Sequence, residues 1–567
     1  MKTKKWIKAS MLLMVATLFV ACANEEIAQD KKKENGTEAP KGGVVFATND
    51  TKISAKRRFI DEDEFAGAKT RTNIKHTPGN GADAYWTSDD FIWVKNKYGA
   101  WNKSTAITLH DGGASAEFTL PGSKADYTDG CEVRYTGDPS SFSATPSAVN
   151  VAFPWNQSRT APNDFSKAGE WGDCGSGVAR NTGNPDKFNF TLSHKSSYLC
   201  FLPRCENVAL APNVRLKSIK ITAILGFVAV KFAGLFSFDG ENIITNTPAF
   251  NNKITVTLPD LPLYTNARQA DNATYLAVLP GTYDLKIVYT IKDPTTNVEM
   301  VISQMLTNVT LNKGEINDIT ADLAPFSTHG NFYMWGAKNP YWYGYEQYQP
   351  QVNDASDPHW PNPADPSVNM NDRDYDHGAT GTAANPVRYD AKADAFSGMQ
   401  GLPNANELCW YVEKGDPRYA TGPYEENGHL VSSNGLWLRK KSTIVAYLKT
   451  IGYPSTLTWD EMKEGYKAYS YSTPIDARLI PQSPYAYASP GAPTNPEDYF
   501  FLPARGCYRS GKLYYRGISG WYWSSNADPS NGKNGLNLVF GDSGGNPFAR
   551  MYSMSECSEG DWVQPFE

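Results

Sequence analysis

Short runs of apolar, β-branched and aromatic residues, separated by turn-forming residues, fill the chain from about residue 43 to residue 326. Two of the longer runs, Leu216–Ile221 and Tyr283–Tyr289, alternate apolar and polar residues, as a strand with one buried face does. No long helical stripe interrupts the runs. Because every sheet must bury an apolar face, we predict a mostly β fold with two tandem antiparallel β-sandwiches, at residues 44–185 and 186–325.

The sequence changes character after residue 326. Nine of the fifteen Trp and 23 of the 32 Tyr follow this point, which indicates a different kind of domain. Residues 326–395 are rich in Pro, Asp and aromatic residues and lack periodicity, so we predict a loop region there. Residues 396–567 combine helix and strand patterns, and we predict an α+β domain for them.

Two helix starts are predicted inside that last domain. Asn404 with Glu407, and Thr458 with Glu461, each form a capping-box pattern. Between these two starts lies a third helical segment, whose apolar residues share one face: Ile444, Val445, Leu448 and Ile451.

The first 21 residues resemble a bacterial export signal. A Lys-rich start precedes the apolar run Met11–Val20, which is too short to span a bilayer, and Ala21 stands directly before Cys22. We predict a lipoprotein signal peptide at residues 1–21 with lipid attached to Cys22; an ordinary signal peptide or a signal anchor is the alternative. Residues 22–43 are polar and predict a flexible tether at the outer membrane or cell surface.

Charge and motifs exclude several classes of function. The net charge of −6 is small and mixed, so the chain lacks the basic surface that nucleic-acid binding requires. No Gly-rich phosphate loop, zinc-binding His-Glu helix or Gly-x-Ser-x-Gly elbow occurs. Gly541–Gly545 resembles the nucleophile segment of trypsin-like proteases, but it follows a predicted strand as a turn. We predict no enzyme activity and no cofactor.

The cysteines and acidic residues do not form a recognisable metal motif. Seven cysteines follow Cys22, an odd number, and Cys200 and Cys205 predict either two buried residues or a local disulfide. Cys507 and Cys557 predict an inter-strand disulfide or two buried thiols. Asp372–Asp376 suggests calcium, but His377 and Ala383 stand where an EF-hand needs Gly and Glu, so a solvated acidic loop is preferred. We predict no metal site.

Six segments of the first 326 residues resemble, in order, the fimbrillin-like family of Bacteroides-type (type V) pili. These segments are Thr70–Thr72, Tyr85–Val94, Ala114–Phe118, Phe190–His194, Tyr275–Gly281 and Leu311–Ile316. The resemblance implies two β-sandwich domains that assemble into, or onto, a fimbrium. It also implies proteolysis after an Arg, for which Arg71 fits best and Arg58 is the alternative. The opened groove would then accept a donor strand from another fimbrial subunit.

The segment from about residue 396 to the end resembles the Fibrobacter succinogenes major paralogous (FISUMP) domain. The matching residues are Leu402–Leu408, Phe501–Gly506 and Gly517–Ser525. The family ends on Val-Arg-Pro-Val, and Trp562–Phe566 stands in that place without the Arg. This resemblance implies a C-type-lectin-like domain that displays loops for binding.

Aromatic residues are the candidate ligand contacts, because their faces stack on sugars and anchor protein interfaces, although they also fill cores. A cluster in the loop region predicts an exposed binding surface, which comprises Tyr341, Trp342, Tyr343 and Tyr345. In the Trp521–Trp523 run we assign Trp523 to the core and Trp521 to the candidate contacts.

The sequence therefore predicts a surface lipoprotein that acts as a fimbrial tip or accessory adhesin. Its lipid-sorted stalk of two sandwiches would accept a donor strand and present a C-terminal domain to a host or bacterial surface glycan or protein. The alternative hypothesis is a cell-anchored glycan-binding lipoprotein that is not incorporated in a pilus.

Overall fold

The structure is a computed structural model, and it describes the greater part of the 567 residues. The described ranges are 43–48, 51–55 (backbone only), 75–183, 187–226, 228–245, 250–325, 330–337, 339–344, 346–353, 356–357, 399, 401–466, 475–480, 482–531 and 533–567. Cys22, Arg58, Arg71, Tyr345 and the Asp372–Asp376 loop lie outside these ranges, so the predictions that concern them remain predictions.

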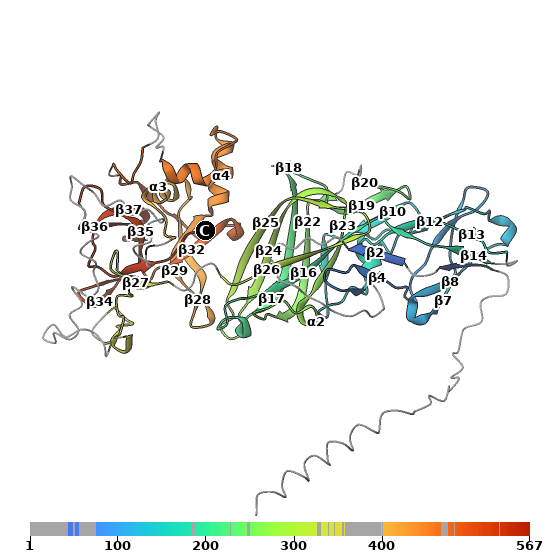
Figure 1. Cartoon of the computed structure of the whole chain (residues 1–567), viewed down its shortest axis with the longest axis horizontal. Coiled ribbons are helices and arrows are strands. Elements are labelled where there is room, and N and C mark those ends of the chain that lie inside the picture. Colours follow the sequence, from blue (N-terminus) through green and yellow to red (C-terminus); the bar gives the residue numbers. More distant parts are fainter. Residues whose placement is uncertain are drawn as a thin grey trace, which may run out of the picture.

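Three groups of sheets lie in a row along the molecule (Figure 1). The first sandwich, in blue, occupies one end, the second sandwich, in green, lies in the middle, and the C-terminal domain, in orange and red, occupies the other end. No helix among the described residues is long and apolar enough to cross a membrane.

The first sandwich packs two five-stranded sheets around one apolar core. In spatial order, one sheet is β13 (Arg180–Asn181), β14 (Lys187–Phe190), β1 (Val44–Thr48), β8 (Ser115–Leu120) and β7 (Ala106–His110). The other is β15 (Ser193–His194), β12 (Gly175–Val178), β9 (Glu132–Tyr135), β5 (Trp93–Lys95) and β6 (Trp101–Lys103).

The second sandwich is built from longer strands. One sheet is β11 (Asn156–Ser158), β22 (Lys253–Pro262), β17 (Arg215–Leu225), β24 (Gly281–Lys292) and β25 (Glu299–Leu311), with β18 (Val228–Ala229) beside β17. The facing sheet is β23 (Thr274–Val278), β16 (Ser197–Arg204), β26 (Glu315–Asp322), β2 (Thr51–Ala55), β4 (Ala82–Ala84) and β3 (Lys75–His76). A small sheet adds β10 (Asn150–Phe153), β19 (Ala233–Phe238), β20 (Ile243–Ile244) and β21 (Phe250–Asn251), and the one-turn helix α2 spans Gln269–Asn272.

Two details of the sandwiches differ from the sequence prediction. The sheets are mixed rather than purely antiparallel, because β1 pairs in parallel with β14 and β26 pairs in parallel with both β16 and β2. The chain also crosses the predicted boundary at residue 185 in both directions: β10 and β11 join sheets of the second sandwich, whereas β14 and β15 return to the first. Long connections between distant strands make these parallel pairings possible.

The C-terminal domain combines helices and sheets, and it includes residues of the predicted loop region 326–395, because β27 joins its main sheet. Its main sheet is β27 (Asn331–Tyr333), β38 (Asp561–Val563), β35 (Ser519–Ala527), β36 (Asn534–Asp542), β37 (Pro547–Glu556) and β30 (Tyr485–Tyr487). A second sheet is β31 (Ser489–Pro490), β28 (Arg418–Glu426), β29 (His429–Arg439) and β32 (Tyr499–Pro503), and β33 (Cys507–Arg509) pairs with β34 (Lys512–Tyr514). The helices are α3 (Ala405–Lys414), α4 (Lys441–Thr450) and α5 (Trp459–Glu464).

Both predicted capping boxes are confirmed. Asn404 caps α3 and its backbone N–H donates to Glu407, while Thr458 and Glu461 make the same reciprocal pair at α5. Each box satisfies two backbone N–H groups that a helix start leaves unpaired.

The second sandwich and the C-terminal domain are joined by a specific contact. The turn between β28 and β29 reaches the second sandwich, where the Leu430 side chain is fully buried in that sandwich's core. Asp293, at the end of β24, accepts hydrogen bonds from the His429 ring and from the Leu430 backbone N–H. The C-terminal domain is therefore docked on the sandwich through a buried side chain.

All seven cysteines after Cys22 are buried thiols. This result excludes a local disulfide between Cys200 and Cys205 and a disulfide between Cys507 and Cys557 in this structure. Burial raises the pKa of the Cys131 thiol to about 11 and that of the Cys174 thiol to about 12, so both remain protonated at neutral pH.

Candidate functional site

Strand β1 occupies an internal position in the first sandwich. It lies between β14, to which it pairs in parallel, and β8, to which it pairs antiparallel. Its side chains alternate between buried and half-buried, and Phe46 stacks on Phe188 with ring centroids 4.9 Å apart. Burial of an apolar side chain such as Val44 or Phe46 stabilises the fold by about 1.5–3 kcal/mol each. Removal of β1 would therefore open a groove between β14 and β8, which both pair with β1 and not with each other.

Strand β2 occupies the equivalent internal position in the second sandwich. It pairs in parallel with β26, where Ser54 and Ala55 face Glu315 and Ile316. On its other side it pairs antiparallel with β4, from Thr51 opposite Ala84 to Ile53 opposite Ala82. One segment of the chain, residues 43–55, thus completes a sheet in each sandwich.

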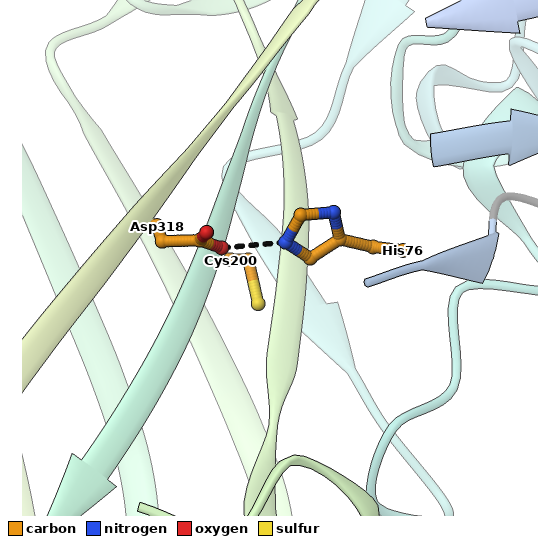
Figure 2. Close-up of side chains that lie close together, drawn as sticks. All are labelled: His76, Cys200 and Asp318. Atoms are coloured by element: carbon orange, nitrogen blue, oxygen red, sulfur yellow. Dashed lines mark hydrogen bonds and ion pairs between the residues drawn. The ribbon is translucent and has the colours of Figure 1, made fainter. Parts of the chain in front are cut away.

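His76 holds the β3–β4 hairpin against the second sandwich independently of β2. Its Nε2 lies 2.5 Å from Asp318 Oδ1 on β26, and its Nδ1 donates to the Gly81 carbonyl oxygen at 2.8 Å. The Gly79 backbone N–H donates to the other Asp318 oxygen at 2.9 Å. Figure 2 shows the imidazole extending from β3 to Asp318, with the Cys200 thiol beside the pair. Because both ring nitrogens contact oxygen atoms, the orientation of the ring is fixed from two sides.

The donor atoms of His76, Cys200 and Asp318 lie within 4.8 Å of one another, so this cluster is the metal-site candidate among the described residues. The geometry does not favour an ion there. A tetrahedral metal bound at about 2 Å from both Nε2 and Oδ1 would hold these atoms more than about 3 Å apart, whereas they are in direct contact. Burial also raises the pKa of the Cys200 thiol well above its usual range, which disfavours the thiolate that a metal needs. The cluster is instead held by the direct contact between His76 and Asp318, which are both buried.

The last residues of the sequence are held in the C-terminal domain. The Phe566 ring is buried and packs on Tyr411 and Phe500. The Glu567 backbone oxygen accepts from the Tyr411 hydroxyl at 2.9 Å, and its side chain pairs with Lys440 at 2.5 Å.

The predicted aromatic binding surface is wrong for two of its residues. Tyr341 and Trp342 are each only 3% exposed and belong to the core of the C-terminal domain. The reason is a distant partner: Tyr341 stacks on Tyr508 at 5.5 Å, and the backbone N–H of Gly511 donates to its hydroxyl. Tyr343, in contrast, is 56% exposed, so among the described residues of this cluster it remains a candidate ligand contact.

Trp521 is also buried, at 8% exposure, so the structure does not support its assignment as a ligand contact. The Tyr515 ring covers it, with centroids 5.3 Å apart. Trp523 is fully buried, which confirms its assignment to the core, and its Nε1 donates to the Tyr333 carbonyl oxygen.

Sequence reasoning missed His76, Asp318 and Leu430. No local motif marks the His76–Asp318 pair, because 242 residues separate its members. The sequence did contain a signal for Leu430. This residue follows Asn427–Gly428, a turn pattern typical of a β-hairpin, and the tip of a hairpin is usually exposed. An apolar residue at such a tip indicates a contact with another part of the protein.

No family model matches the chain, and no curated protein matches it. Solved structures match part of the chain. A candidate cell adhesion protein from Bacteroides ovatus is 13% identical, and the match covers 43% of this chain and 88% of that protein, with a TM-score of 0.27. A candidate cell adhesion protein from Bacteroides uniformis is 12% identical, and the match covers 50% of this chain and 95% of that protein, with a TM-score of 0.26. The fimbrial anchor protein Mfa2 from Porphyromonas gingivalis is 10% identical, and the match covers 49% of this chain and 90% of that protein, with a TM-score of 0.21. At such low scores, the function of this chain has to be inferred from its own contacts.

Proposed function

We propose that this protein is a fimbrial tip or accessory adhesin that accepts a donor strand and presents a C-terminal ligand-binding domain at the cell surface. The observation that carries the proposal is the position of β1 and β2. Both come from residues 43–55, and both fill internal positions of sheets whose other strands come from elsewhere in the chain.

Proteolysis after Arg71, or after Arg58, would remove both strands in one cut. The loss would leave open edges on β8 and β14 in the first sandwich and on β26 and β4 in the second. An incoming segment that replaced both β1 and β2 would restore both sheets. Such a strand would need apolar residues at the positions of Val44 and Phe46, whose side chains are buried.

The same chain is poorly suited to donate a strand to a neighbour. β26 lies between two other strands, and the fully buried Leu323 follows it directly. The chain then enters β27, which pairs with β38 in the C-terminal domain. Phe566 and Glu567 are engaged in that domain as well. A strand held between two others and followed by a second folded domain is poorly placed to enter a neighbouring subunit, which supports the tip position.

Lipid attachment at Cys22 would hold the uncut protein at the outer membrane, and either cut would release it from that anchor. The C-terminal domain, which we propose to have the C-type-lectin-like architecture, would carry the ligand site. The lipid anchor is tested by Cys22→Ala, which should not incorporate labelled fatty acid.

The decisive experiment measures uptake of a strand by trimmed protein. The purified protein is cut with an Arg-specific protease, and N-terminal sequencing should return Thr72, or Phe59 for the alternative site. A labelled peptide of residues 43–55 should bind the trimmed protein, whereas the same peptide with Phe46→Asp should not. In purified pili, the mature protein should start at the same residue and immunogold should label the tips. A mature N-terminus at Cys22, or label along the whole shaft, would contradict the proposal.

One observation favours the alternative of an anchored glycan-binding lipoprotein. The uncut chain already completes both sheets with its own strands, so it is a closed fold without any partner. This alternative predicts protein at the cell surface with its N-terminus at Cys22 and none in purified pili.

A further inference from the structure

A cleft of about 500 Å³ lies between the second sandwich and the C-terminal domain. One wall is formed by Glu299–Ser303 of β25, and the other by residues of β28, β29, β32 and β38. The cleft has the size of pockets that hold small molecules, and such pockets occur preferentially at domain interfaces.

Trp437 of β29 lines this cleft and carries an unsatisfied hydrogen-bond donor. The side chain is only 6% exposed, and its Nε1 has no hydrogen-bond partner among the described residues. Buried polar groups in native proteins are almost always paired, so this unpaired N–H is a candidate donor to a bound ligand.

Arg505 supplies a second unsatisfied donor in the same cleft. Its guanidinium carbon lies 4.5 Å from the Tyr424 ring centroid and 4.6 Å from that of Trp562, and both aromatic residues also line the cleft. Nη1 pairs with Glu426 at 2.5 Å, but Nε is buried without a partner among the described residues. The two aromatic contacts fix the guanidinium in place, so the free N–H is held ready for an acceptor.

The charges around the cleft are nearly balanced. Among the lining residues, Glu299, Glu425 and Glu567 are acidic, and Lys440 and Arg505 are basic. Lys440 pairs with Glu567, and Arg505 pairs with Glu426 outside the lining. An anionic ligand would gain no unpaired cation, so the cleft favours a neutral ligand.

Aromatic rings provide the apolar part of the walls. Phe501 of β32 lies 5.1 Å from Trp437, measured between ring centroids, and both rings line the cleft. Gly422 makes room for this pair, because a Cβ at that position would lie 2.4 Å from the Phe501 ring.

We propose that this cleft binds a neutral sugar residue, such as the end of a surface glycan. A sugar ring offers an apolar C–H face for the aromatic walls and hydroxyl oxygens that accept from Trp437 Nε1 and Arg505 Nε. Its hydroxyl hydrogens can donate to the lining carboxylates of Glu299 and Glu425.

An extended peptide is the competing occupant. β25 is the last strand of its sheet in the described structure, and its outer edge could pair with an added strand. A peptide bound in that way would use the backbone of β25 and would not require the Trp437 and Arg505 N–H groups. The two occupants therefore respond differently to side-chain substitution.

The biological purpose of the sugar site rests on the proposed adhesin role, but its binding test does not. Binding is measured on the uncut full chain, in which strand uptake plays no part. Failure of sugar binding therefore leaves the strand-uptake result intact, and failure of strand uptake leaves the sugar site intact.

The experiment tests the purified full-length protein on an array of neutral and acidic glycans and on a library of extended peptides. Glycan hits are then titrated calorimetrically. Trp437→Phe keeps a ring but removes the N–H, and Arg505→Lys keeps the charge but removes Nε. Trp155→Phe is the matched control, since Trp155 is 36% exposed, packs on Phe142 and does not line the cleft.

We expect at least one neutral glycan to bind, with an affinity reduced at least about tenfold by Trp437→Phe and by Arg505→Lys and unchanged by Trp155→Phe. All variants should keep the thermal midpoint of the unaltered protein within a few degrees. The proposal is overturned if no neutral glycan binds, if folded Trp437→Phe and Arg505→Lys variants bind as tightly as the unaltered protein, or if only peptides bind.

Discussion

Asp293 and His429 connect the second sandwich to the C-terminal domain through a 2.8 Å hydrogen bond between Asp293 Oδ2 and His429 Nδ1. The same carboxylate oxygen accepts from the Leu430 backbone N–H at 3.1 Å, and the Leu430 side chain enters the sandwich core. Lys220 and Glu497 form a further ion pair across this interface at 2.9 Å. The two domains are therefore joined by several specific contacts.

We predict that Leu430→Ala loosens the C-terminal domain without unfolding it. Truncation of a buried Leu costs about 2–5 kcal/mol, and here the loss falls on the docking contact. Limited proteolysis should cut the chain faster between the two domains, and small-angle scattering should show a larger radius of gyration. Leu225→Ala is the control, because Leu225 is 58% exposed. Equal proteolysis rates for the two variants would show that Leu430 does not hold the domains together.

The stability of this interface should depend on pH through Asp293. Burial alone would raise the pKa of Asp293, but hydrogen bonds from His429 and from the backbone N–H groups of Thr295 and Leu430 lower it below its ordinary value. The stabilisation by the carboxylate is therefore fully present above the unfolded-state pKa of about 3.9 and is lost as pH falls through the lower folded-state pKa.

The test compares thermal midpoints of the unaltered protein and Asp293→Asn between pH 7 and pH 3. At neutral pH the variant should be less stable by about 1.5–3 kcal/mol, because it loses hydrogen bonds to a charged group. The difference should shrink at the acidic end of the series. A difference that stays constant over the whole range would assign the effect to packing rather than to the charge.

Trp342 and Tyr343 are neighbours in sequence with opposite expected behaviour. Trp342 is 3% exposed and packs edge-on against Tyr508 at 5.9 Å, whereas Tyr343 is 56% exposed. Trp342→Ala should destabilise the C-terminal domain by about 3–5 kcal/mol, measured by chemical denaturation. Tyr343→Ala should change stability by less than about 0.5 kcal/mol, as surface substitutions usually do. Similar small effects of both substitutions would restore the whole aromatic loop as a candidate binding surface.

Local signals predicted local structure well in this chain. The capping residues Asn404 and Thr458 mark true helix starts, because the bonds that define a cap join residues three positions apart. The alternation in Leu216–Ile221 marks β17, where Leu216, Ile219 and Ile221 are all buried. A bulge between Leu216 and Ser218 shifts the register and lets Leu216 and Ile219 share a face although they are three residues apart.

Contacts between distant residues could not be predicted in this way. The burial of Tyr341 depends on Tyr508, and the position of β1 depends on strands at residues 115–120 and 187–190. A periodic pattern tells which face of a strand is apolar, but it does not tell which other strand covers that face. The aromatic loop was misassigned for this reason, and the His76–Asp318 pair was missed for the same one.

The last prediction concerns His76 after removal of the N-terminal strands. In the uncut chain, β4 is held to the second sandwich by β2 and also by the His76–Asp318 pair. Once β2 is gone, the pair, the Gly79 N–H bond to Asp318 and the Gln269 bond to the His76 carbonyl oxygen remain to keep β4 opposite β26. His76→Ala should therefore reduce the affinity of the trimmed protein for the 43–55 peptide at least about tenfold, since a hydrogen bond to a charged group contributes about 1.5–3 kcal/mol. His110→Ala is the matched control, because His110 is half exposed and its nearest carboxylate oxygen, on Glu117, is 3.8 Å away. If the two variants bind the peptide equally well, β4 does not depend on His76 for its position, and the groove in the second sandwich is held open by other contacts.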